Sequence, residues 1–280
     1  MPVPAPDTNE KTSRLRPWVG FVSGCAGGVA DLAINYPPYG IKYRLQCNEC
    51  IDWKKLTETR HLTNGYTLKY LYRGVLVSSF GFVPAIMIQD GVSTYLLRCQ
   101  PANAPAYYDA MSTAVGGAAS AIVTAPVGNV IIAQQKGNTG MLQAIQGLYY
   151  QGGIIRFARG GSVLMCRDSI YGLGVFWGVD YIKMRLEKNA AFRGSSSTTL
   201  IASMLAGSMA SVLSQIPDTL AAKIQNDNSE KSSPWRIFRK TLQEQGMKEF
   251  YRGGLFRALS IGASAYVVYG VTNYVKNRFK

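Results

Sequence analysis

Three copies of one sequence unit, each about 90 residues long, constrain the fold of this chain more than any other feature. Each copy contains a proline followed eight or nine residues later by a glutamine. The pairs are Pro37 with Gln46, Pro126 with Gln135, and Pro217 with Gln225. A glycine precedes each pair, at Gly28, Gly117 and Gly207, and a turn ending in Arg-Gly follows it, as LYRG to Gly74, FARG to Gly160 and FYRG to Gly253. Since three landmarks keep one register, the chain repeats one structural unit three times.

Each unit contains two long apolar segments separated by a polar loop. A helix of about 30 residues is roughly 45 Å long, enough to cross a bilayer with tilt. Each loop is expected to hold a short amphipathic helix, most clearly where Pro234 precedes Trp235, Phe238 and Leu242 on one face. We therefore predict an all-α membrane protein with six spans in three hairpins. The expected first segments are 17–46, 107–136 and 197–226, and the second are 74–99, 160–186 and 253–278.

The predicted organisation is a polar tail at 1–16 followed by one integral domain of three repeats, 17–100, 104–187 and 196–280. The tail lacks the apolar stretch of a secretory signal and makes a poor transit peptide, so targeting information is expected to be internal.

The formal net charge of +14 indicates an anionic partner, but only 16% of the residues are charged. This low charge density favours a membrane over a nucleic acid, and no zinc-finger spacing is present.

Cysteine and histidine content argues against metal or redox chemistry. The five cysteines include one Cys-x-x-Cys pair, Cys47 and Cys50, and the single histidine is His61. Two loop thiols explain the pair better than a zinc site does. No nucleophile stands near a base, so we predict no enzyme activity, no metal and no cofactor.

Charged residues inside the apolar segments point to a polar interior. Arg98, Arg185 and Arg278 lie near segment ends, where a long side chain reaches the membrane surface. Arg167 and Asp168 lie about a dozen residues from either end, so they are expected to face a water-filled cavity.

The repeat and its motifs resemble the mitochondrial carrier family over almost the whole chain. The resemblance implies a pseudo-threefold bundle of six tilted helices around a cavity, with three short matrix helices and kinks at Pro37, Pro126 and Pro217. It implies alternating-access transport of a small solute, by exchange, across the mitochondrial inner membrane by a monomeric multi-pass protein that binds no nucleic acid.

The family's two gates are both reduced in this sequence. At the matrix gate the acid positions hold Tyr39, Gly128 and Asp218, the bases Lys42, Ile131 and Ala221, and the bracing glutamines are Gln46, Gln135 and Gln225. One bridge is expected there, Asp218 with Lys42, while Tyr39 and Ile131 form a hypothetical apolar replacement for a lost pair. The cytoplasmic gate has acid positions Thr94, Asp180 and Asn273 and base positions Leu97, Lys183 and Lys276. One bridge is expected, Asp180 with Lys276.

Substrate contacts, by the same resemblance, lie twelve to thirteen residues before each cytoplasmic-gate acid position. They are Gly81 and Phe82, Arg167 and Asp168, and Ser260 and Ile261. The Arg-acid pair is similar to that of carriers of amino acids and related zwitterions, since a guanidinium binds a carboxylate and a carboxylate binds an ammonium. The two residues can also pair with other groups of the protein, and a nucleotide or other phosphorylated anion is the alternative substrate.

Two further expectations follow from the resemblance. The turns at Arg73-Gly74, Arg159-Gly160 and Arg252-Gly253 correspond to the family's cardiolipin sites, although glycine can also serve the turn alone. Because four of six gate bridges are lost, a carrier-shaped membrane adaptor that no longer transports is the other reading.

Overall fold

Six long helical segments run through the part of the chain that the computed structural model describes. That part comprises residues 17–46, 75–101, 104–105, 107–137, 140–189, 192–193, 195–226, 233–251 and 254–279. Five segments are single helices: α2 (Pro17–Gln46), α6 (Val75–Arg98), α7 (Tyr107–Gly137), α11 (Ser196–Asn226) and α13 (Gly254–Arg278). The sixth joins α9 (Gly161–Gly172), the π-helical turn η1 (Leu173–Gly178) and α10 (Val179–Glu187). The predicted long segments are confirmed as helices to within one residue at each end.

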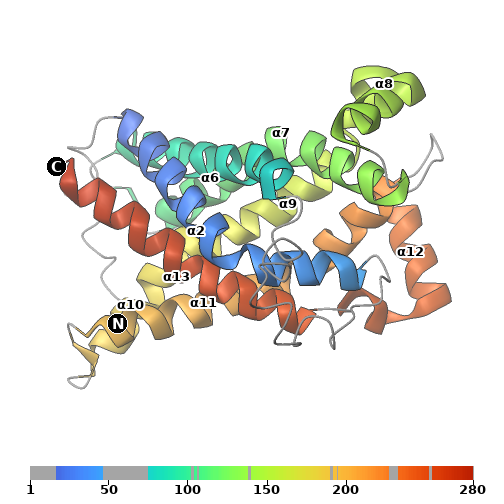
Figure 1. The fold of residues 1–280 in the computed structure, drawn as a ribbon. Helices are drawn as coiled ribbons and strands as arrows, with labels where there is room; N and C mark the ends of the chain where they lie inside the picture. The colour runs from blue at the N-terminus through green and yellow to red at the C-terminus, as the bar shows by residue number, and fades with distance from the viewer. Residues whose placement is uncertain are drawn as a thin grey trace, which may run out of the picture.

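The six segments form a closed ring (Figure 1). Each packs against the next one in the chain, and α13 packs against α2, which closes the ring. Since neighbours in the chain are neighbours in space, each repeat contributes one hairpin of two long helices.

The repeated glycines explain why the three hairpins pack alike. Gly28 of α2 faces Val83 of α6, and a Cβ atom there would lie 3.1 Å from the Val83 Cα atom. A Cβ atom at Gly207 would lie 2.7 Å from the carbonyl oxygen of Ile261. Gly117 is pressed in the same way against the backbone of Asp168. In every repeat, then, the glycine at the repeated position marks the point where the two helices come into backbone contact.

Large apolar side chains face outward, and small polar side chains lie inside the bundle. Ser23, Ser203 and Ser264 are fully buried, whereas Ile122 is 76% exposed and Leu213 is 65% exposed. Buried polar side chains and exposed large apolar side chains are typical of a protein surrounded by lipid rather than by water. Among the described residues, three helical stretches are long and apolar enough to cross a membrane: Ser78–Arg98, Tyr107–Gln134 and Ser197–Asn226. The protein is therefore an all-α membrane protein.

Two of the three expected amphipathic helices lie at one end of the bundle, α8 (Met141–Phe157) and α12 (Pro234–Gln245) (Figure 1). The rings of Trp235 and Phe238 stack at 5.6 Å, and Phe238 packs at 5.2 Å against Phe250 of η3 (Met247–Tyr251). A break interrupts α8 at Gly153, whose φ of 63° favours glycine. The loop of the first repeat, where the third such helix is predicted, lies outside the described residues.

Proline lies inside four of the long helices: Pro37 and Pro38 in α2, Pro84 in α6, Pro126 in α7 and Pro217 in α11. Each removes one backbone N–H from its helix. The side chain of Pro37 lies outside the described residues, and the kinks at the motif prolines stay a prediction.

Candidate functional site

A cavity of about 180 Å³ lies at the centre of the ring, and all six long segments contribute to its wall. The wall contains apolar residues, among them Leu32, Phe82 and Ile131. It also contains polar and charged residues. Among these are Gln89, Arg167, Asp168, Tyr171, Asp218 and Arg257.

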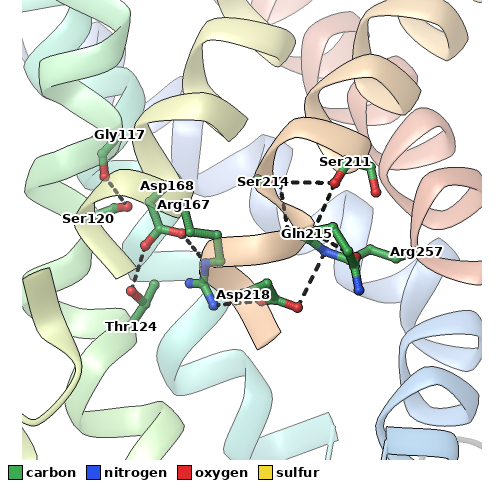
Figure 2. A network of polar contacts seen from close by, with 10 residues as sticks. All are labelled: Gly117, Ser120, Thr124, Arg167, Asp168, Ser211, Ser214, Gln215, Asp218 and Arg257. Carbon is green, nitrogen blue, oxygen red and sulfur yellow. Dashed lines mark hydrogen bonds and ion pairs between the residues drawn. The ribbon is translucent and has the colours of Figure 1, made fainter. Parts of the chain in front are cut away.

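The charged residues form one chain across four helices (Figure 2). Thr124 of α7 donates a hydrogen bond of 2.7 Å to Asp168 Oδ2, and Arg167 Nε donates one of 2.7 Å to Asp168 Oδ1. Arg167 Nη1 reaches Asp218 Oδ1 on α11 at 3.3 Å. Arg257 Nε of α13 lies 3.5 Å from Asp218 Oδ2. Positive and negative groups therefore alternate from one side of the cavity to the other.

Arg257 was not predicted from the sequence, although it is the most deeply buried of these charged groups. Its side chain is 4% exposed. Nη1 donates to the Ser211 carbonyl oxygen at 3.1 Å and to Gln215 Oε1 at 3.0 Å, while Nη2 donates to Ser214 Oγ at 2.9 Å. The sequence did contain a clue, since Arg257 lies three residues before the expected contact Ser260. The twelve-to-thirteen-residue spacing that selects Ser260 does not select it.

The remaining expected substrate contacts divide into two groups. Gly81, Phe82 and Ile261 line the cavity. Ser260 does not belong to the lining, and its buried hydroxyl has no hydrogen-bond partner among the described residues. Gln89, another lining residue that the spacing rule missed, has a buried amide nitrogen without a partner in the described part of the chain.

The gate expected around Asp218 is described only in part. The side chains of Tyr39, Lys42, Gln46 and Gln135 lie outside the described residues, so the bridge from Asp218 to Lys42 stays a prediction. Ile131 faces the cavity. Gln225 donates to the Arg159 carbonyl oxygen at 3.5 Å and is 7% exposed.

The opposite gate contains an ion pair, but with a different acid from the predicted one. Lys276 Nζ lies 2.5 Å from Oδ1 of Asp90, and Ser23 donates to Oδ2 of the same carboxylate at 2.5 Å. The predicted acid, Asp180, accepts a hydrogen bond from Tyr269 instead. Asp90 lies four residues before Thr94, hence one helical turn away on the same face of α6. Among the described residues Lys276 therefore pairs with Asp90, and the bridge from Asp180 to Lys276 stays a prediction.

Lys183, the third residue expected at this gate, lies on α10. It has no ion-pair partner within the described ranges.

The turn before α9 is the one Arg-Gly turn that falls within the described residues. Gly160 caps the helix with a φ of 77°, a conformation that favours glycine. Asn129 of α7 holds the turn by donating to the carbonyl oxygens of Phe157 at 3.0 Å and Arg159 at 3.1 Å. The turns at Arg73-Gly74 and Arg252-Gly253 lie outside the described residues.

The described residues include no group of three His, Cys, Asp or Glu side chains that could hold a metal ion. Cys47 and Cys50 lie outside the described ranges.

Comparison with known proteins gives one family. The model of the family "Mitochondrial carrier protein" matches residues 193–280. A probable mitochondrial 2-oxodicarboxylate carrier from Dictyostelium discoideum is 23% identical over 98% of this chain and 93% of its own length. A mitochondrial arginine transporter from Arabidopsis thaliana is 24% identical, covering 90% of this chain and 89% of its own. A glutamate/glycine mitochondrial carrier from Schizosaccharomyces pombe is 25% identical, covering 89% and 91%.

Proposed function

We propose that the chain belongs to the mitochondrial carrier family, whose members are transporters and not enzymes, and that it exchanges small carboxylate-bearing metabolites, amino acids above all. The protein is a multi-pass protein of the mitochondrial inner membrane. All six long segments cross the bilayer in this proposal, as three hairpins of one domain with repeats at 17–100, 104–187 and 196–280, and the protein acts as a monomer.

The arrangement of Arg167 and Asp168 carries the substrate assignment. Both line the cavity, and the side chain of Arg167 is 22% exposed, the most of the four charged lining groups. A guanidinium binds a carboxylate through two parallel hydrogen bonds, and a neighbouring carboxylate accepts an ammonium. Two arginines and two aspartates balance one another in the described lining, which suits a zwitterion better than a multiply charged phosphate. Gly81, Phe82 and Ile261 complete the wall around the solute.

Transport follows from opposing gates at the two ends of this cavity. The pair Lys276–Asp90 would close one end, with Asp180 and Lys183 nearby, and the pair Asp218–Lys42 the other, braced by Gln46 or Gln225. Bound substrate favours the state in which its own contacts are strongest, so binding energy opens one gate as the other forms. Exchange rather than one-way flow follows because the empty cavity lacks that energy.

An anionic lipid is the second proposed ligand class. Gly160 begins α9 in a left-handed conformation, and a helix N-terminus attracts a phosphate through its N–H groups and dipole. With Arg159 beside it, this turn is proposed to bind cardiolipin, as are Arg73-Gly74 and Arg252-Gly253.

Substitution of Arg167 tests the substrate assignment. In liposomes containing the purified protein and internal amino acid, Arg167→Ala should reduce uptake of labelled arginine, glutamate or glycine by about 10- to 100-fold, since a hydrogen-bonded charged contact contributes about 1.5–3 kcal/mol. Arg185→Ala is the control, because Arg185 lies at the end of α10 against the ring of Tyr181. Equal uptake by the wild type and the Arg167 variant would contradict the assigned site.

A further inference from the structure

Asp218 is held between two arginines that come from different helices. Arg167 of α9 approaches one carboxylate oxygen at 3.3 Å, and Arg257 of α13 approaches the other at 3.5 Å. Figure 2 shows the carboxylate pointing between the two guanidinium groups. The aspartate is 12% exposed and belongs to the cavity wall.

The two arginines differ in how firmly they are fixed. Arg257 is tied by hydrogen bonds to Ser211, Ser214 and Gln215 on α11, the helix that carries Asp218. Its side chain is 4% exposed, and any movement away from this position would break these hydrogen bonds. Arg167 is more exposed to the cavity, and its shortest contact is to the adjacent Asp168 at 2.7 Å. The Arg167–Asp218 contact is therefore the one that a solute can reach.

Resting on the proposed function, we propose that Asp218 occupies the place on Arg167 that the carboxylate of the substrate takes. Arg257 is a positioning residue for this exchange, because it retains Asp218 when the substrate displaces it. A buried carboxylate that lost its partner would oppose binding. With Arg257 in place, Asp218 exchanges one of two arginine contacts and keeps the other, so the carboxylate of the substrate enters without leaving an unpaired charge.

The proposal makes Asp218 an internal competitor of the substrate, and the two neighbours of Arg167 then have opposite effects on affinity. Removing the charge of Asp218 weakens the competitor, so the KM for substrate falls. Removing the guanidinium of Arg257 leaves Asp218 with Arg167 as its remaining described arginine contact, so the competitor is strengthened and the KM rises. A role limited to stability would not separate the two variants in this way.

The first experiment uses acetate, which does not depend on knowing the substrate. Asp218→Ala should create a carboxylate-sized site between the two arginines. Acetate should then raise the unfolding temperature of the purified variant in detergent by several degrees, by mass action, and raise that of the wild type less. Acetamide has the same size without the charge and should have no such effect. Glu244→Ala, on the exposed face of α12, is the matched acidic control and should respond to acetate as the wild type does.

The second experiment measures uptake kinetics in liposomes for labelled glycine, glutamate and arginine. Asp218→Asn, which keeps the side-chain volume, should lower the KM severalfold even if the maximal rate falls. Arg257→Gln should raise the KM severalfold, and the double variant should resemble Asp218→Asn alone.

A KM that is unchanged or raised in Asp218→Asn, or an acetate effect equal in Asp218→Ala and the wild type, overturns the inference. If the wild type takes up none of the three amino acids, the proposed amino-acid transport fails. The acetate measurement then decides the inference by itself.

Discussion

Asp90 is a buried acid whose only described cation lies on the opposite end of the chain. It is 1% exposed, and it binds Lys276 at 2.5 Å and Ser23 at 2.5 Å. The three residues come from α6, α13 and α2, so this one carboxylate ties together three of the six long segments. Removal of the Lys276 charge should therefore destabilise the packing of all three helices.

Lys276→Met should lower the free energy of unfolding by about 3–5 kcal/mol, because it leaves the buried Asp90 charge unpaired. The double variant Asp90→Asn with Lys276→Met should recover most of that loss. Thermal unfolding in detergent measures both, with Lys183→Met as the control lysine. If the double variant is as unstable as the single one, Asp90 and Lys276 are not coupled.

At the scale of single residues, the sequence predicted that Arg167 and Asp168 face a cavity, but it did not predict the residues around them. Both lie near the middle of an apolar segment, and a charged side chain at that depth usually faces a water-filled cavity or another charged group. Arg257, Gln89 and Asp90 were missed as site residues because the spacing rule fixes positions by counting from the family's motif. Asp90 lies one helical turn before Thr94, so it is on the same face of α6 but not at the position that the motif specifies. Its pairing with Lys276 depends on how α6 packs with α2 and α13, which the sequence does not show.

At the scale of the helices, the repeated glycines determine where the two helices of a hairpin pack closely against each other. Gly207 of α11 lies against the backbone of Ile261 and Gly262 on α13. Gly270, on the same α13, has open space around it. One added methyl group thus meets backbone in the first position and nothing in the second.

Gly207→Ala should destabilise the protein by about 1–3 kcal/mol, since a methyl group forced into a packed interface separates the two helices. Gly270→Ala should leave stability nearly unchanged. Thermal unfolding of the two purified variants gives the comparison. Equal unfolding temperatures for both would mean that α11 and α13 do not rely on close contact at Gly207.

The sequence predicted the helices well because length and apolar content determine them. It did not predict η1 or the break in α8. The residues of η1, Leu173–Gly178, are apolar and contain no proline, so they read as uninterrupted α-helix. Such a turn depends on how Gly174 fits against Ala210 and Ala206 of α11, which is a tertiary contact.

At the scale of the whole molecule, the described part of the chain presents three free cysteines at positions that report on the membrane. Cys99 is exposed just after α6, Cys166 is exposed on α9, and Cys25 is half-buried. In the proposed arrangement Cys99 lies at the cytoplasmic surface and Cys166 faces lipid. The two thiols should therefore differ in their access to water although both are exposed in the bare protein.

In mitoplasts, a variant that retains only Cys99 should react with a membrane-impermeant maleimide added outside. A variant that retains only Cys166 should react after detergent is added and not before. Mass spectrometry of the labelled protein distinguishes the two. Labelling of Cys166 in intact mitoplasts would place α9 outside the bilayer core and refute the six-span arrangement.

The π-helical turn η1 has a consequence for the symmetry of the molecule. Thr94, Asp180 and Asn273 each follow their Arg-Gly turn by twenty residues, so the three copies look interchangeable when counted. In the second copy the wider turn absorbs about one residue, and an α-helix rotates by about 100° per residue. The second hairpin therefore differs in local helix geometry from the first and third, whose second helices, α6 and α13, contain no π-helical turn. The three copies agree in their count along the sequence but not in the helix that carries each gate position.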